Sequence, residues 1–277
     1  MAIPKIIHFL WMSETKDEKT EACIASWKKH LDGYEIKEWN GTNFPYNDFA
    51  WTKEAVAAKS WAYVTDFFRL WVLYNYGGIY LDADVMLQQN FDVFLHNKVF
   101  IGTEHTCQLG PHCIGAEAKN EYIKECLDFY QDKNFILSDG TLNMIPIPRI
   151  MSYLLIKRYN YTGILANFTD NPIVLKDEVT IFPDNYFTID VADGKNVGVH
   201  LALGSWRIGE WKKSQPIYSE GIQNYYIKKF FLYDLSQKKG IRKILYAILP
   251  NFIISWYMKK SHKIKNIKRI KSISMYY

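Results

Sequence analysis

The period of the apolar residues changes at Gly77-Gly78, and this change separates a predicted helix from a predicted strand. From Thr52, an acceptable N-cap, good helix formers lead into apolar residues at helical spacing that continue through Tyr74. The two glycines end this helix, because glycine adopts the left-handed geometry of a helix C-terminus without steric strain. The residues that follow alternate between two faces, which predicts a strand. One face carries Ile79, Leu81, Ala83 and Val85, and the other carries Tyr80, Asp82, Asp84 and Met86.

Two carboxylates on one face of a strand favour a cation site. Asp82 and Asp84 are expected to lie within roughly 7 Å of each other, given a rise of about 3.3 Å per residue. Like charges this close repel, which raises the pKa of one carboxyl group unless a cation intervenes. Mg²⁺ and Mn²⁺ bind carboxylates together with phosphates and water, so the pattern predicts a divalent ion that carries a diphosphate. The alternative is a solvated strand edge.

A charged pair lies inside the predicted helix. Asp66 and Arg69 are three residues apart and therefore share a helix face that is otherwise apolar. Burying such a pair is unfavourable unless its members are paired or serve a ligand. The pair is therefore either part of a binding site or a structural ion pair.

Two further segments carry candidate chemistry. Residues 3–11 (IPKIIHFLW) form a short apolar run typical of a buried strand, with Trp11 at its C-terminal end. Ligands of open α/β sheets bind at that end of the strands. Residues 199–206 (VHLALGSW) place His200 in an apolar stretch, where imidazole is an acceptable Mn²⁺ ligand. For Trp11 and His200 alike, the alternative is a core residue.

With these residues in view, the sequence resembles the Asp-x-Asp (DXD) glycosyltransferases grouped as family 32. That family includes fungal mannosyltransferases of the outer-chain-initiating type and bacterial capsular polysaccharide glycosyltransferases, and its core is similar to that of the clostridial glucosylating toxins. The resemblance covers roughly residues 3–210 and is anchored at 3–11, 66–84 and 199–206. The family's late segment has two histidines, and here Leu201 replaces the second.

The resemblance implies roles for individual residues. Trp11 would stack on the nucleotide base, Asp66 would contact the nucleoside, and Arg69 the phosphates or donor sugar. Tyr80 would contact the diphosphate, while Ser205 and Trp206 would cap the phosphates. Asp84 would bind the metal directly, and Asp82 would bind the ribose or sugar and approach the metal through water. His200 would complete the metal shell or touch the diphosphate. Asp82, Asp84 and Arg69 are the candidate catalytic residues, and Glu104 is expected near the acceptor.

Charge is distributed unevenly along the chain of 277 residues. The net charge is +5, but residues 228–277 contain thirteen Lys or Arg and one acid, so that segment carries +12 and the remainder −7. Apolar residues recur there at helical spacing from Ile241 to Trp256, and Pro250 interrupts them. An apolar stripe flanked by cations is typical of a helix that lies on an anionic membrane surface. The alternatives are docking on the protein's own core, a dimer contact or nucleic-acid binding. Nucleic acid is not expected as a partner, since no nucleic-acid-binding motif accompanies the basic run.

Composition adds little that is specific. Hydrophobic residues make up 48% of the chain, which suffices for a substantial core. Four cysteines without zinc-type spacing are expected to be free thiols in a reducing compartment, and no signal peptide is expected because the first residues already favour a core strand.

Together, these observations predict an α/β protein with a GT-A-type domain at 1–227, a central mixed sheet flanked by helices, and a basic helical tail at 228–277. The implied activity is a metal-dependent, retaining transfer of a hexose from a nucleotide-diphosphate sugar, with Mn²⁺ or Mg²⁺ as cofactor. UDP-galactose or UDP-glucose is preferred over GDP-mannose as the donor. The acceptor would be a saccharide, lipid-linked, in bacterial surface or capsular polysaccharide synthesis at the inner face of the cytoplasmic membrane. The alternative is a non-catalytic nucleotide-sugar or carbohydrate-binding protein of the same fold.

Overall fold

The computed structural model describes residues 2–104, 108–160, 171–176, 178–188 and 194–201. They fall within the unit built from Met1–Glu104 and Gln108–Trp206. The predicted domain boundary at 227/228, the basic tail and Cys107 lie outside the described residues. The three cysteines inside them, Cys23, Cys113 and Cys126, are buried free thiols.

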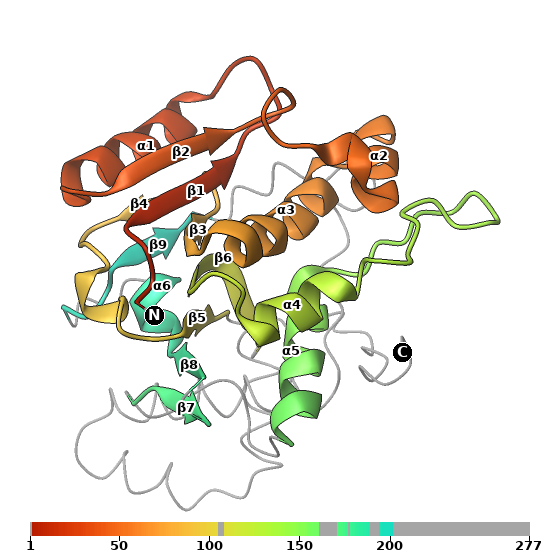
Figure 1. Cartoon of the computed structure of the whole chain (residues 1–277). Helices are drawn as coiled ribbons and strands as arrows, with labels where there is room; N and C mark the ends of the chain where they lie inside the picture. The colour runs from red at the N-terminus through yellow and green to blue at the C-terminus, as the bar shows by residue number, and fades with distance from the viewer. Residues whose placement is uncertain (1, 105–107, 161–170, 177, 189–193, 202–277) are drawn as a thin grey trace, which may run out of the picture. The chain divides into compact units, whose positions relative to one another are not determined.

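A mixed seven-stranded sheet forms the centre of the described region (Figure 1). Strands β2, β1 and β3 are parallel, β6 runs antiparallel between β3 and β5, β8 is parallel to β5, and β7 is antiparallel to β8. In sheet order the strands are β2 (Glu35–Trp39), β1 (Ile6–Leu10), β3 (Gly78–Leu81), β6 (Leu109–Ala116), β5 (Val99–Thr103), β8 (Val179–Phe182) and β7 (Ile173–Leu175). A separate antiparallel pair consists of β4 (Val85–Leu87) and β9 (Gly198–His200).

Helices cover both faces of the sheet, and each face has its own apolar core. One core contains residues of α2 (Ala50–Ala57), α3 (Trp61–Tyr76), α4 (Glu121–Asp128) and α5 (Ile147–Tyr159). The other contains residues of α1 (Glu18–His30), β4, the 3-10 turn η2 (Asp92–Phe94) and α6 (Asp184–Phe187). A further 3-10 turn, η1 (Tyr46–Asp48), precedes α2. The predicted α/β architecture, a central mixed sheet flanked by helices, is confirmed.

The alternation predicted after the double glycine decides which core each side chain of β3 joins. Ile79 and Leu81 pack in the core with α1, whereas Tyr80 packs in the core with α3. The prediction of one continuous strand through Met86 is wrong, because the chain turns at Asp82–Asp84, where the Val85 N–H donates to the Asp82 carbonyl at 3.1 Å. After the turn, β4 leaves the large sheet and pairs with β9.

The helix expected to begin at Thr52 is two helices. Helix α2 begins earlier, at Ala50 with Phe49 as N-cap, and Thr52 lies inside it with its hydroxyl donating to the Tyr46 carbonyl at 2.5 Å. Lys59, which has a φ of 52°, interrupts the helical conformation between α2 and α3. The Trp51 indole donates to the Tyr63 carbonyl at 3.1 Å and so joins the two helices. Helix α3 ends at Tyr76, and Gly77 is its C-cap with a φ of 66°, so the glycines end the helix as predicted.

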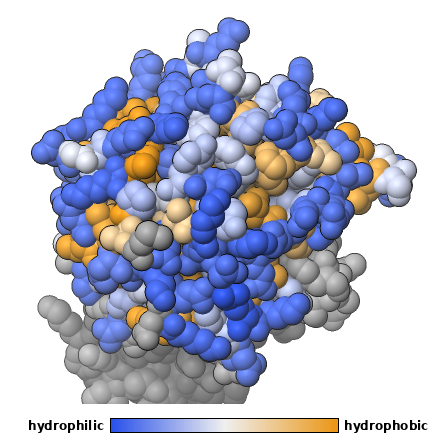
Figure 2. Space-filling model, viewed as in Figure 1, coloured by the Kyte–Doolittle hydropathy of each residue, from blue (hydrophilic) through white to orange (hydrophobic). Residues whose placement is uncertain are grey.

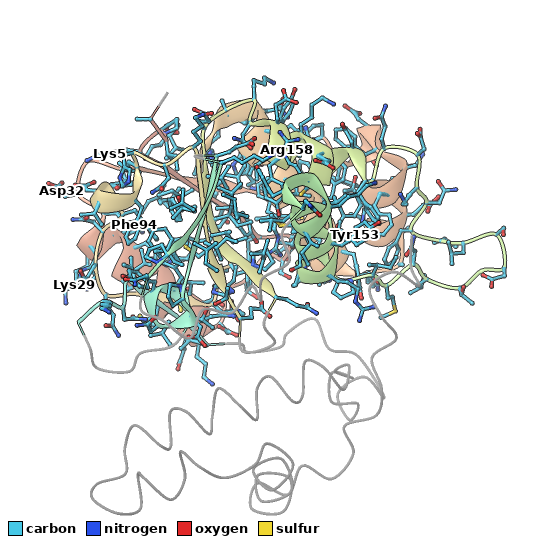
Figure 3. All side chains as sticks on the ribbon, turned by 90° about the horizontal axis from the view of Figure 1, so that it is seen from below. Lys5, Lys29, Asp32, Phe94, Tyr153 and Arg158 are labelled. Carbon is cyan, nitrogen blue, oxygen red and sulfur yellow. The ribbon has the colours of Figure 1, made fainter. Side chains whose placement is uncertain are left out.

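The surface of the described region carries ion pairs and is mainly polar on the face shown in Figure 2. Arg158 of α5, labelled in Figure 3, forms ion pairs with Glu125 of α4 and Glu178 before β8, both at 3.2 Å. The face seen in Figure 2 is mainly hydrophilic, with separate apolar patches. Among the described residues, every helix is too short or too polar to cross a membrane.

Candidate active site

The candidate site lies where the parallel strands end. Strands β1, β3 and β5 run in the same direction, so their carboxyl ends share one edge of the sheet. Asp82 follows β3 directly, and Glu104 follows β5. His112 of the intervening β6 lies opposite Asp82, whose N–H donates to the His112 carbonyl at 2.9 Å. Ligands of α/β sheets bind at this edge.

The entry into β3 requires glycine. Gly78 has a φ of +97°, and a Cβ at this position would lie 2.6 Å from the Ile6 carbonyl oxygen of β1. The absence of a side chain therefore lets β3 pair closely with β1. This pairing holds the residues after β3 at the functional edge.

The two aspartates and His200 converge. One ligand atom from each of Asp82, Asp84 and His200 lies within 4.8 Å of the others. His200 Nε2 is 3.4 Å from Asp84 Oδ1, and the side chains of Asp84 and His200 are 20% and 19% exposed. Pairing of Val85 with His200, together with the Leu201 N–H that donates to the Asp84 carbonyl at 3.0 Å, brings these distant segments together. Two carboxylates and an imidazole are a suitable ligand set for Mn²⁺.

A buried network lies behind Asp82. Arg69 Nη2 is 3.0 Å from Asp66 Oδ1 and 3.4 Å from Asp82 Oδ1, and Arg69 Nη1 donates to the Pro111 carbonyl at 2.8 Å. The Tyr80 hydroxyl also donates to Asp82 Oδ1. Its ring centroid lies 4.8 Å from the Arg69 guanidinium carbon. The network therefore fixes the orientation of Asp82, whose side chain remains 23% exposed.

Burial and charge set the protonation of this network. Burial raises the pKa of Asp66 to about 7, although Arg69 and the Ile147 N–H oppose the rise. Burial would lower the pKa of Arg69, but Asp82, Tyr80 and Asp66 raise it on balance, so Arg69 stays charged. Burial raises the pKa of Tyr80 well above its usual value, so the phenol keeps the proton that it donates to Asp82.

His200 lies among carboxylates. Burial opposes its charged form, but the hydrogen bond and charge of Asp84, with help from Asp82 and Glu104, raise the pKa of His200 on balance. Only the neutral ring is a metal ligand, so a divalent cation that binds here competes with protonation of His200.

Sequence reasoning missed His112. It lies in β6, is 1% exposed, and stacks on His200 with ring centroids 4.2 Å apart and planes inclined by 14°. A single histidine inside an apolar strand gives no periodic signal. Glu104, which was expected near the acceptor, lies beside it, with Oε1 3.7 Å from His112 Nδ1.

The remaining predicted donor contacts are placed only in part. Trp11 follows the end of β1, at the same edge as Asp82, and its indole donates to the Thr15 carbonyl at 3.1 Å. Ser205 and Trp206 lie outside the described residues. The roles of Trp11, Asp66, Arg69 and Tyr80 toward a donor stay predictions.

Part of the chain matches a known protein family. Residues 11–101 match a family model described as the glycosyltransferase sugar-binding region containing DXD motif. The match includes Asp66, Arg69, Tyr80, Asp82 and Asp84, and it confirms the resemblance to DXD glycosyltransferases over this region.

Curated relatives come from Schizosaccharomyces pombe. Inositol phosphoceramide mannosyltransferase 3 is 34% identical over 36% of this chain and 29% of its own length. Inositol phosphoceramide mannosyltransferase 2 is 24% identical over 67% of this chain and 56% of its own length. The chain therefore spans less than two thirds of these relatives. A solved structure, PaToxG Glycosyltransferase, aligns with a TM-score of 0.45 and 18% identity over 57% of this chain and 70% of that chain.

Proposed function

We propose that this chain, which carries the sugar-binding region of the DXD glycosyltransferases, transfers a hexose from a nucleotide-diphosphate sugar to a saccharide acceptor with the help of a divalent cation. The observation that carries the proposal is the convergence of Asp82, Asp84 and His200 at the carboxyl edge of the sheet. All three side chains are about one fifth exposed, so a ligand can reach them.

The ligand set suits Mn²⁺ better than Mg²⁺. Mg²⁺ strongly prefers oxygen ligands in octahedral geometry, whereas Mn²⁺ also accepts an imidazole. When bound, the cation would act as a Lewis acid that neutralises the charge developing on the departing diphosphate. Asp84 and His200 would hold the ion, with Asp82 contacting it through water.

The buried network would keep the acidic edge in a fixed arrangement. Arg69 and Tyr80 both contact Asp82 Oδ1, so they restrict rotation of the carboxylate. A ligand whose orientation is fixed in advance binds a cation without losing further conformational freedom. We propose no catalytic base, and the family resemblance favours retention of the anomeric configuration.

The donor is proposed to be a UDP-hexose, galactose or glucose. GDP-mannose is the second candidate, favoured by the relatives, which are named mannosyltransferases.

The acceptor is proposed to be a lipid-linked saccharide in bacterial surface or capsular polysaccharide synthesis. The sequence of the basic segment at 228–277 supports a location on the inner face of the cytoplasmic membrane, since cations beside apolar residues at helical spacing are typical of segments that bind anionic lipid.

The experiment is a screen of purified protein against UDP-glucose, UDP-galactose and GDP-mannose, with release of free nucleotide as the readout. We expect Mn²⁺-dependent turnover of one donor, and we expect Asp84→Asn to abolish it without changing the melting temperature by more than a few degrees. Asp32→Asn is the matched control, because Asp32 is exposed at the periphery (Figure 3). Unchanged turnover in Asp84→Asn would remove the cation site from the proposal.

A non-catalytic binding protein of the same fold is the competing function. It predicts that the protein binds a nucleotide sugar with Mn²⁺ but releases no nucleotide from any donor. The same screen, combined with calorimetric titration, separates the two functions.

A further inference from the structure

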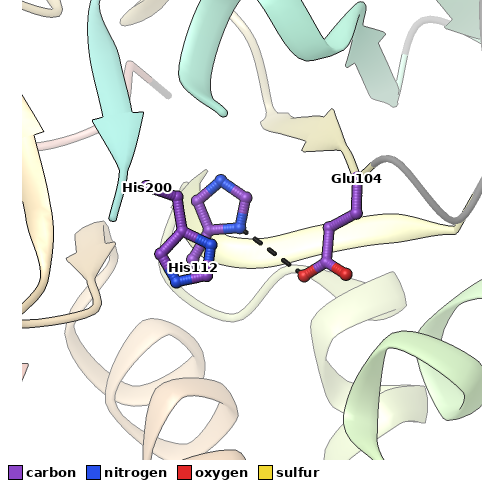
Figure 4. A group of neighbouring side chains, drawn as sticks. All are labelled: Glu104, His112 and His200. Carbon is purple, nitrogen blue, oxygen red and sulfur yellow. Dashed lines mark ion pairs between the residues drawn. The ribbon is translucent and has the colours of Figure 1, made fainter. Parts of the chain in front are cut away.

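A second group of ligand atoms lies beside the DXD turn. Its three members come from different segments (Figure 4): Glu104 follows β5, His112 lies inside β6, and His200 is the last residue of β9. One ligand atom from each residue lies within 4.8 Å of the others. His112 is 1% exposed on its side chain and Glu104 is 26% exposed, so the group joins the protein interior to the surface.

Hydrogen bonds on one side of His112 fix the state of its ring. Nε2 lies 3.1 Å from the Phe187 carbonyl oxygen, which only accepts hydrogen bonds, so Nε2 carries the proton. Thr188 Oγ1 lies 3.2 Å from the same nitrogen and donates its own proton to the Thr103 carbonyl at 2.8 Å. Thr188 therefore also acts as an acceptor for His112. In the neutral ring, Nδ1 is then left with a lone pair.

The Nδ1 atom of His112 faces the Glu104 carboxylate without forming a hydrogen bond to it. It is buried and has no hydrogen-bond partner in the part of the chain that the structure describes. Glu104 Oε1 lies 3.7 Å from this nitrogen, which is longer than a hydrogen bond. A lone pair on nitrogen thus faces a carboxylate oxygen, and leaving a buried polar atom in this state is unfavourable.

A cation between the two atoms would give the lone pair of His112 Nδ1 a partner. Bonds of about 2.0–2.2 Å from one tetrahedral ion to nitrogen and oxygen place those two atoms roughly 3.4 Å apart, close to the separation observed. A ligand imidazole usually donates its other N–H to a backbone carbonyl, as His112 does to Phe187. Two imidazoles and one carboxylate favour a transition-metal ion such as Zn²⁺ over Mg²⁺.

We propose that Glu104, His112 and His200 form a second metal site, for a Zn²⁺-like transition-metal ion, next to the Asp82–Asp84 turn. The site does not depend on the sugar-transfer function. His200 belongs to both ligand groups, so an ion at the second site shares or competes for a ligand of the first.

The test uses the full chain with Asp84→Asn, which disrupts the first group and leaves the second intact. Co²⁺ serves as the probe, because its visible absorption reports ligation directly, and Zn²⁺ is then titrated to displace it. We expect Asp84→Asn to bind one equivalent of Co²⁺, and Zn²⁺ to displace it. In that background we expect Glu104→Gln to weaken binding at least tenfold. Glu121→Gln, on the exposed surface of α4, is the matched control and should change nothing.

His112→Gln provides the second variant. A glutamine amide can still donate to the Phe187 carbonyl, but it lacks the Nδ1 ligand, so Co²⁺ affinity should fall by a similar factor. If this buried substitution prevents folding, as judged by circular dichroism, the more exposed Glu104→Gln decides alone. Loss of all Co²⁺ binding in Asp84→Asn, or unchanged binding after Glu104→Gln, would overturn the proposal. Sugar-nucleotide turnover is read separately, so failure of the proposed function leaves this result interpretable.

Discussion

The hydroxyl of Tyr80 donates a hydrogen bond to Asp82 Oδ1, two residues further along the chain. Tyr80 is buried on β3, whereas Asp82 lies just beyond the strand with its side chain 23% exposed. The bond therefore connects the interior of the sheet to the candidate metal site. It explains how a residue with almost no exposure can affect a ligand that binds at the surface.

Tyr80→Phe should weaken Mn²⁺ binding by up to about tenfold, because the Asp82 carboxylate, which would contact the ion through water, loses one of the hydrogen bonds that orient it. Arg69 still contacts Asp82 in this variant, so the carboxylate is loosened rather than released. Affinity is measured by titration with Mn²⁺ and electron paramagnetic resonance of the free ion. Tyr122→Phe is the matched control, since Tyr122 is also buried and donates to the Met151 carbonyl at 2.9 Å. Equal affinity in the two variants would show that the Tyr80 bond does not act on the metal site.

Asp66→Asn should change how stability depends on pH. The pKa of Asp66 is raised to about 7, so the folded protein binds a proton that the unfolded chain releases near pH 4. The stability of the wild type should therefore fall relative to the variant as pH rises from about 4 to about 7, by up to about 1.4 kcal/mol per pH unit. Urea unfolding of both proteins at several pH values measures the difference. A difference that stays constant across this range would contradict the raised pKa.

Gly78→Ala should destabilise the fold by more than about 1 kcal/mol for two reasons. The added Cβ would clash with the Ile6 carbonyl oxygen, and residue 78 has a positive φ that alanine does not favour. The expected result is a lower urea midpoint with loss of metal binding in the unfolded fraction. Gly33→Ala is the matched control: Gly33 also has a positive φ, of +75°, but nothing lies within 4 Å of a Cβ there. Equal destabilisation of both variants would assign the effect to backbone conformation alone.

Deletion of residues 241–277 should release the protein from vesicles that contain anionic lipid. The segment supplies both the apolar stripe and most of the basic residues of the tail, and each cation near an anionic surface contributes about 1 kcal/mol. Co-sedimentation with vesicles of phosphatidylglycerol and phosphatidylcholine measures the loss, and pure phosphatidylcholine vesicles are the control. Full binding by the truncated protein would contradict membrane association through the tail.

Local sequence patterns predicted the helix end and the strand at the centre of the site. The turn that follows the strand is set by pairing between distant segments. The glycines that end α3 and the alternation of Ile79, Tyr80 and Leu81 are local features, so they could be read directly from the sequence. The Asp82–Asp84 turn could not be predicted, because it depends on pairing of β4 with β9, a segment far away in the sequence.

The break between α2 and α3 was missed for a related reason. Lys59 adopts a positive φ that its residue type does not favour, and the hydrogen bond from the Trp51 indole to the Tyr63 carbonyl spans the break. His112 was missed because its proposed role depends on neighbours from β5 and β9 rather than on its own strand. Only the folded arrangement reveals such a residue.

Calorimetric titration of UDP in the presence and absence of Mn²⁺, on the wild type and on Asp84→Asn, measures whether a cation at Asp84 carries the diphosphate. UDP should bind the wild type at least tenfold more tightly with Mn²⁺ than without it, and Asp84→Asn should lose this gain while remaining folded. GDP is titrated in parallel, since it reports the second candidate donor. If Mn²⁺ has no effect on the binding of UDP or GDP to the wild type, or if its effect persists in Asp84→Asn, a cation held by Asp84 does not carry the diphosphate.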